Sequence, residues 1–412
     1  MRRLLQAGRL YGLWLGCLAL AAAAVVNLGI GFYDLIAGPK GAGDLRFRWI
    51  EQGYIGTGEN PYDVFTIHIK KDLSNEHGEL DRRSAIDPRV GMPGYQGYPP
   101  WSFFTAKLFV STGTFQQARY FFALMNAIGL TVAAVWAFRE GSPQGMLPGL
   151  VLMLGCLALF SNFITLRLGQ YGILINAMLI GMYSLRQRSW QFPAGVLLGM
   201  AALKPQLSAP FGLVVLARRN WLAAGTSICY IIVASLIIGA TVATNPIVML
   251  KQLQASLKSE YWHSSQLGLL DPLAHLGVDR QVVTVLNLAL GTLIGSLLVW
   301  RYRKHSDLTL MAICSVTAQL WSYHRRYDQT AMAFLLVALG KESFSERRAP
   351  VIAAFLVVGL SLWCPMRESD WQGAIPMCQY AAWMIGLAVL LRNSRSSDVR
   401  EQRADVENGT KE

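Results

Sequence analysis

The sequence predicts an all-α polytopic membrane protein with about 10–12 transmembrane segments and a long first extracytoplasmic loop. Of its 412 residues, 53% are hydrophobic and only 15% are charged, whereas a soluble protein carries about a quarter charged residues. Apolar runs close to the roughly 20 residues that span a bilayer recur along the chain. The net charge of +12 is explained by Lys and Arg residues in short loops, which set the orientation of the spans in the membrane. We therefore expect no nucleic-acid partner.

The first span is expected at about 10–33. Arg2, Arg3 and Arg9 precede it and place the N-terminus in the cytoplasm. A cleaved signal peptide would share the basic start, but this apolar run is longer than a typical signal-peptide core. We therefore expect an uncleaved span.

Two of the later spans carry internal polar breaks, "KPQ" in 192–217 and "SYHRRYD" in 308–340. Counting each of these as two short spans gives about twelve, with both termini inside. Basic stubs such as "RRNW" and "RYRKH" then face the cytoplasm, and both breaks share the outer face with the 34–116 loop. The remaining spans are expected near 117–138, 146–160, 171–185, 222–243, 281–300, 350–364 and 376–391.

One integral membrane domain is expected over residues 1–392. Its 34–116 loop should contain interfacial helices on the extracytoplasmic side. Residues 393–412 are polar and charged, so we expect a disordered cytoplasmic tail. Cys364 and Cys378 flank one short loop, and whether they pair depends on the redox state of that face.

Asp44 follows the first span in a glycine-flanked turn. The segment "DLRFRWIEQGY" that it begins can form an interfacial helix with Leu45, Trp49 and Ile50 on the apolar side. Asp44 either caps this helix or acts as a general base at the membrane surface. Asp34, closer to the span, is the other candidate for the base.

Aromatic and amide side chains mark two further stretches of the outer face. Tyr98 and Trp101 belong to "YPPW", which reads either as belt aromatics with helix-start prolines or as the wall of a lipid-facing cavity. Gln170 and Tyr171 lie at a span boundary, where they either pair helices or line the same cavity.

Lys204 lies beside Pro205 inside an apolar segment. The proline removes an intrahelical hydrogen bond and frees carbonyl groups, so it breaks the helix. The lysine either snorkels to the interface or binds an anionic headgroup at the break.

The second break holds His324, Arg325, Arg326 and Asp328. One charged side chain at the bilayer centre costs roughly 2.5–3.5 kcal/mol, so this segment must reach water or line a polar cavity. If it is helical, His324 and Asp328 share a face and Arg325 also meets Asp328. The cluster either ties two helix ends together or binds a phosphate, because two arginines exceed one aspartate and their planar donors suit phosphate.

The order of these motifs resembles glycosyltransferase family 87, the DUF2029-type mannosyltransferases of the GT-C fold that use polyprenol-phosphate mannose. An Asp follows the first span, then "GENPY" at 58–62, "YPP" at 98–100, "GQ" at 169–170, "LKPQ" at 203–206 and a His-containing break near 324. The resemblance covers most of residues 10–392. It departs at "WSYHRRYDQT", where many members have a Trp/His-His pair, and at an insertion over 66–97, and both bear on the preference for mannose.

The resemblance implies an inverting transfer of a sugar, a hexose such as mannose, from a polyprenyl-monophosphate donor. The acceptor is a hydroxyl on a glycolipid or glycan outside the cytoplasm, and the location is the plasma (inner) membrane. Asp44 takes the role of general base, and His324 with Arg325 or Arg326 binds the donor phosphate. Lys204 matches the lysine of the family's "KP" element. Tyr98, Trp101, Gln170, Tyr171 and Asp328 are candidates for lining the cavity.

No metal ligands and no cofactor beyond the donor lipid are expected. Two other functions use the same features. A transporter or flippase of a lipid-linked anionic substrate needs the cations but no base. A transferase of a phosphoglycerol or acyl group adds a nucleophilic Ser or Thr, or a metal cluster.

Overall fold

The fold is a bundle of α-helices, described here from a computed structural model for residues 2–39, 41–64, 97–257, 268–270, 273, 276–321, 324–365 and 374–409. The predicted insertion at 66–97 lies almost wholly outside these residues, as does most of the short loop between Cys364 and Cys378. The described helices are α1 (Arg2–Ile36), α2 (Gly43–Gly56), α5 (Pro100–Ala106), α6 (Phe115–Gly141), η1 (Ser142–Gln144), α7 (Met146–Leu157), α8 (Phe160–Leu168), α9 (Gly172–Gln187), α10 (Gln191–Ala201), α11 (Pro205–Ala217), α12 (Trp221–Thr241), α13 (Pro246–Leu257), α15 (Arg280–Arg301), α16 (Asp307–Trp321), η3 (Arg326–Met332), α17 (Ala333–Glu346), α18 (Ala349–Trp363) and α19 (Ala374–Gly409).

Helix length and composition confirm the prediction of an all-α polytopic membrane protein. Within the described residues, five helical segments are long and apolar enough to cross a membrane: Tyr11–Ile36, Phe115–Gln144, Met146–Leu168, Trp221–Thr241 and Val282–Arg301. Shorter apolar helices pack among them, and α16 and the first half of α17 lie in the core with nearly every side chain buried.

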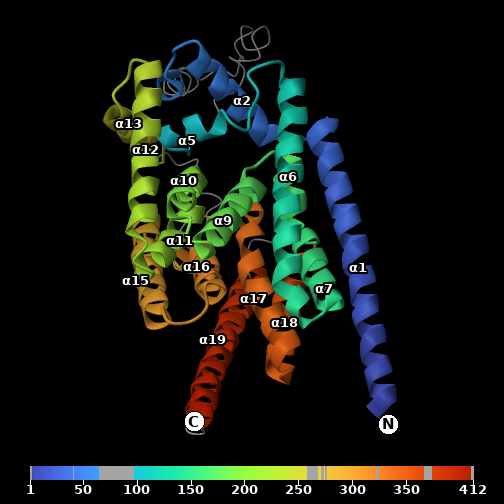
Figure 1. Ribbon diagram of the computed structural model, residues 1–412. Coiled ribbons are helices and arrows are strands. Elements are labelled where there is room, and N and C mark those ends of the chain that lie inside the picture. The colour runs from blue at the N-terminus through green and yellow to red at the C-terminus, as the bar shows by residue number, and fades with distance from the viewer. Residues whose placement is uncertain are drawn as a thin grey trace.

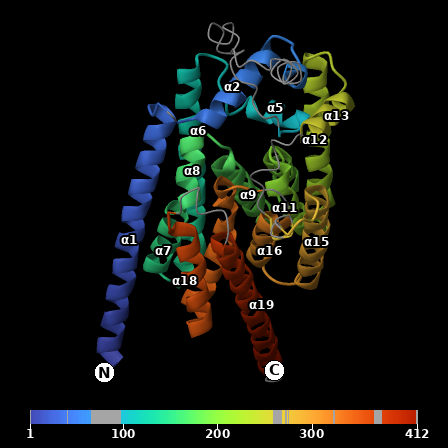
Figure 2. The ribbon, with the colours of Figure 1, turned by 180° about the vertical axis from the view of Figure 1, so that it is seen from behind.

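The two termini lie at the same end of the bundle (Figure 1). Helices α2, α5 and α13 lie at the opposite end, and the view from behind shows the same arrangement (Figure 2). Helices α2 and α5, both from the first loop, cover the bundle there. We refer to these as the terminal end and the α2 end.

The two predicted helix breaks are present. Helix α10 ends at Ala201 and α11 begins at Pro205, with Lys204 at the N-cap position. At the second break the prediction of shared helical faces is wrong, because Arg325 is extended and the chain resumes as the 3₁₀ helix η3. The Asp328 carboxylate accepts the Arg325 backbone N–H at 2.9 Å. This side-chain bond closes a tight turn in place of an α-helical one.

Helix α19 extends through residue 392 to Gly409, so the helix includes most of the polar tail. No proline or glycine interrupts the sequence between Asn393 and Asn408, so nothing in the chain stops the helix once it has begun. At the start of α19, Cys378 is free and exposed, as is Cys364.

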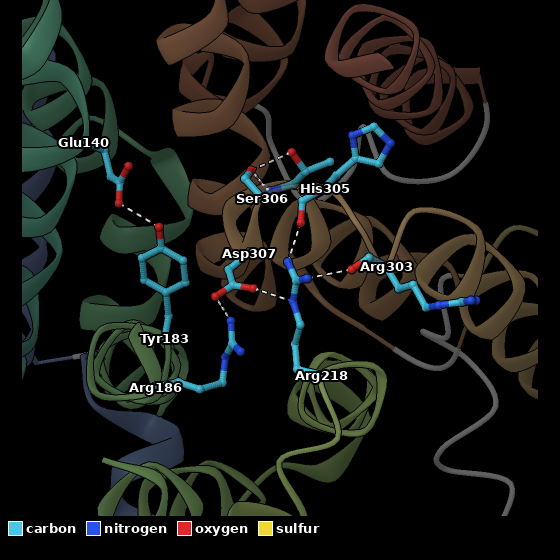
Figure 3. A network of polar contacts seen from close by, with 9 residues as sticks. Glu140, Tyr183, Arg186, Arg218, Arg303, His305, Ser306 and Asp307 are labelled. Atoms are coloured by element: carbon cyan, nitrogen blue, oxygen red, sulfur yellow. Dashed lines mark hydrogen bonds and ion pairs between the residues drawn. The ribbon is translucent and has the colours of Figure 1, made fainter. Parts of the chain in front are cut away.

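A polar network ties helices together toward the terminal end (Figure 3). Asp307 at the start of α16 binds Arg186 of α9, and it accepts from Arg218 Nε, at the end of α11, at 2.8 Å. Arg218 Nη1 also donates to the carbonyl of Arg303 at 2.6 Å, and Nη2 donates to that of His305. One carboxylate and one guanidinium therefore hold four helix ends.

A second carboxylate extends these ties. Glu140 at the end of α6 accepts from the Tyr183 hydroxyl of α9 at 2.8 Å and pairs with Lys341 of α17, also at 2.8 Å. The two carboxylates together connect α6, α9, α11, α16 and α17. The terminal end of the bundle is thus fixed by ion pairs between helices that are distant in sequence.

Candidate functional site

The turn between α8 and α9 is where the first loop meets the bundle. Gly169 there has φ 74°, a conformation that other residues adopt only with strain. A Cβ on Gly169 would lie 2.5 Å from the Cβ of Leu45. The carbonyl of Arg167 accepts the N–H of Ala42, the residue that precedes α2, at 2.7 Å. The start of α2 is therefore held directly against this turn.

The same turn contacts the second helix break. A Cβ on Gly172 would lie 2.4 Å from the backbone oxygen of Tyr327 in η3. The Thr165 hydroxyl donates to that oxygen at 3.2 Å. The sequence "GQYG" thus brings together the helix of Asp44 and the segment of Asp328, which lie far apart in the chain.

Asp44 lies in the first turn of α2 and is half-buried. Gln170 donates from Nε2 to Asp44 Oδ2, and the Tyr98 hydroxyl donates to Gln170 Oε1 at 3.1 Å. A carboxylate only accepts, so it fixes the direction of the Gln170 amide. The N-cap residue of α2 is Ala42, without a side-chain cap bond. Asp44 is therefore held by Gln170 and is not used as the helix cap.

Tyr98 is the central residue on this side of the site. Its backbone carbonyl accepts the Tyr62 hydroxyl at 2.5 Å, and its ring meets Tyr171 edge-on with centroids 5.9 Å apart. The guanidinium of Arg48 lies 4.3 Å from the centre of the Tyr98 ring, and Arg48 pairs with Glu51 at 2.8 Å. Sequence reasoning missed Arg48 and Glu51. In the sequence, only their positions four and seven residues after Asp44 indicated that they could lie near it.

Helix α5 caps the helix break at Pro205. The Trp101 indole donates to the carbonyl of Ala202 at 2.7 Å, and the Ser102 hydroxyl donates to that of Leu203 at 2.7 Å. These are carbonyls of the kind that a helix end leaves without intrahelical partners. Trp101 thus holds the break in place and positions Lys204.

Lys204 binds the second break across the bundle. Its Nζ lies 2.5 Å from Asp328 Oδ1 and 4.3 Å from the centre of the Tyr327 ring. Both Lys204 and Asp328 are buried. We expected Asp328 to pair with His324 and Arg325 nearby in the chain. The structure instead pairs it with a lysine 124 residues away and with the backbone N–H of Arg325.

The other cations of the cluster have different surroundings. His324 is buried, and its Nε2 lies 3.3 Å from the Tyr380 hydroxyl. Arg326 is buried with its guanidinium 5.8 Å from the centre of the Phe160 ring. Arg325 alone among these three is exposed. It is therefore the member best placed to meet a ligand.

Electrostatic interactions link Asp44 on α2 with the cations at the two helix breaks. The charges of Asp44 and Arg325 both act on Lys204. Burial raises the pKa of the Tyr98 phenol, Arg48 opposes that rise, and the charges of Asp328 and Asp44 add to it. The carboxylate on α2 and the cation cluster at the two helix breaks therefore share one neighbourhood at the α2 end.

The other acidic candidates lie outside this neighbourhood. Asp34 pairs with Arg167, with Oδ2 3.7 Å from Nε. Asp63 accepts from Asn60 at 2.9 Å and from Gln252 of α13 at 2.5 Å, so it ties the first loop to α13. Within the described part of the chain, no three His, Cys, Asp or Glu side chains gather as metal ligands.

The family model of glycosyltransferase family 87 matches residues 95–322, which include Tyr98, Gln170 and Lys204. No curated protein matches the chain.

The contact at Gly172 predicts a selective loss of stability. Gly172→Ala would push the Tyr327 carbonyl away, and overpacking of this kind costs about 1–3 kcal/mol. Gly212→Ala in α11 is the matched control, since a Cβ there meets nothing within 4 Å. We expect a lower unfolding temperature in detergent for Gly172→Ala alone. Equal unfolding temperatures for the two variants would contradict the close approach.

Proposed function

The chain belongs to glycosyltransferase family 87 and is a membrane glycosyltransferase, and on this premise we propose its reaction. The reaction is the inverting transfer of a hexose such as mannose from a polyprenyl-monophosphate donor to a hydroxyl of a glycolipid or glycan. It takes place at the α2 end, which we assign to the extracytoplasmic face of the plasma (inner) membrane. The observation that carries the proposal is the shared neighbourhood of Asp44 and the Lys204–Asp328–Arg325 cluster.

Asp44 is the general base in this reaction. Gln170 binds Oδ2, so Oδ1 remains to accept the proton of the acceptor hydroxyl. The hydroxyl oxygen attacks the anomeric carbon from the side opposite the phosphate, and the bond from that carbon to the phosphate oxygen breaks. A positioned carboxylate within hydrogen-bond reach suffices for this step.

The cation cluster stabilises the leaving group. Polyprenyl phosphate departs with the electrons of the broken bond, so negative charge grows on its oxygens. Arg325 is exposed and offers the planar donors that suit phosphate. Lys204 is held by Asp328, and a cation fixed before the reaction needs no reorganisation when the charge develops. His324 and Arg326, which flank Arg325 in the chain, are buried.

The polar ties toward the terminal end argue against the alternative of a transporter or flippase. Alternating access requires that end to open as parts of the protein move against each other. Asp307 and Glu140 join α6, α9, α11, α16 and α17 there through ion pairs and hydrogen bonds. Opening would break these contacts and separate partly buried charges.

Replacement of Asp44 tests the base. Asp44→Asn keeps the shape and the place beside Gln170 but cannot take up the proton, and loss of a general base typically lowers the rate by about 10²–10⁴-fold. We expect the variant to insert normally and to bind donor. The measurement is sugar transfer from polyprenyl-phosphate mannose to extracted membrane lipids in proteoliposomes.

Two matched variants complete this test. Asp34→Asn and Asp63→Asn change carboxylates of the same region that lie outside the site, and both should keep most of the activity. Near-wild-type transfer by Asp44→Asn would remove Asp44 from the mechanism. A large loss in Asp34→Asn alone would move the base there.

Replacement of Arg325 tests the phosphate pocket. A hydrogen bond to a charged group is worth roughly 1.5–3 kcal/mol, so Arg325→Ala should weaken donor binding about tenfold or more. Arg46→Ala is the control, because Arg46 is an exposed arginine of α2. Donor affinity is measured by titration of polyprenyl-phosphate mannose. Unchanged affinity in Arg325→Ala would leave the cluster with a structural role only.

A further inference from the structure

Arg48 and Glu51 form a buried ion pair beside the base. Arg48 is 7% exposed and Glu51 is 4% exposed, although α2 covers the end of the bundle. Charged residues are almost never this buried without a reason, because desolvation of two ions is expensive. The pair plays no part in the reaction steps above.

Contacts lead from this pair back to Asp44. Arg48 pairs with Glu51 and lies over the Tyr98 ring, and the Tyr98 hydroxyl binds Gln170. Gln170 then binds Asp44, which lies one helical turn before Arg48 on α2. The contacts therefore form a closed ring that leaves α2 at Arg48 and returns to it at Asp44.

We propose that Arg48 and Glu51 are positioning residues for the base. Arg48 holds Tyr98, and through it the Gln170 amide, against Asp44. The negative charge of Glu51 offsets the positive charge of Arg48 that acts on Asp44. Asp44 therefore keeps the basicity that the reaction needs. The inference rests on the proposed function of Asp44.

The surroundings of Glu51 make its charge conditional on pH. Burial raises the pKa of Glu51 to about 7, against the lowering effect of Arg48. Its Oε1 has no hydrogen-bond donor within the described part of the chain. Below this pH Glu51 is neutral, and the charge of Arg48 acts on Asp44 unopposed. Above it Glu51 is ionised and balances Arg48.

Other ionisable groups among the described residues lie near the pair. Tyr62 and Tyr98 lie beside it, and burial raises the pKa of each phenol. On α6, Arg119 donates to backbone carbonyls at the end of α1. On α8, Arg167 pairs with Asp34 at the same place. Neither arginine shares the contacts of Glu51.

The pH profile of transfer by the full chain in proteoliposomes tests the inference. In the wild type, kcat/KM should rise about threefold to tenfold across a step centred near pH 7, as Glu51 ionises. Glu51→Gln keeps the size of the side chain but fixes it as neutral. We expect this variant to lose the step and to keep, at pH 8, the low rate of the wild type at pH 6.

Two further variants separate positioning from structure. Arg48→Gln removes the charge on which Glu51 acts, and it should also abolish the step near pH 7. In Arg48→Gln, burial keeps the Glu51 carboxyl neutral. This variant therefore provides the test if Glu51→Gln does not fold. Asp63→Asn, in the same loop but outside the ring of contacts, should keep the wild-type step.

The outcomes distinguish this inference from the proposed function. If Asp44→Asn remains active, the assignment of the base fails first. If Asp44→Asn is inactive but Glu51→Gln and Arg48→Gln keep the wild-type profile, the pair is only structural and the inference is overturned. A reduced amount of folded protein with an unchanged profile has the same meaning.

Discussion

The candidate site depends on the close backbone approach at the "GQYG" turn. Gly169 and Gly172 leave no room for a Cβ, because Leu45 of α2 and the Tyr327 carbonyl of η3 occupy that space. Both segments are therefore held against one short turn between α8 and α9. The turn also supplies Gln170, which binds Asp44 directly. A single local feature thus joins the first loop to the second helix break, and with it the base to the cation cluster.

The two helix breaks position the cation cluster of the same site. Pro205 ends the hydrogen-bond ladder of α10, and Trp101 and Ser102 of α5 bind the exposed carbonyls. This places Lys204 in the core, where a lone cation would be unstable, and Asp328 supplies its partner. At the terminal end, ion pairs hold the helices that carry these residues. The structure combines a fixed end with a polar site at the other, which suits chemistry on a bound lipid headgroup.

The sequence was sufficient for the class, the family and the two breaks, because apolar run length and Pro205 act locally. It was not sufficient for the pairing of Lys204 with Asp328, since these residues are 124 positions apart and local spacing favoured His324 and Arg325. Arg48 and Glu51 were missed for a related reason. On an interfacial helix their charges indicate a side facing water, and only contact with Tyr98 shows that they are buried. The roles of Asp44, Lys204 and Arg325 remain predictions.

The most direct test is whether the wild-type chain breaks the bond between sugar and phosphate. Purified protein in proteoliposomes is supplied with polyprenyl-phosphate mannose and extracted membrane lipids, and mass spectrometry follows both. We predict an acceptor lipid heavier by one hexose, together with released polyprenyl phosphate. Movement of intact donor between the leaflets, with no hexose added to any lipid, would contradict a transferase and favour a transporter.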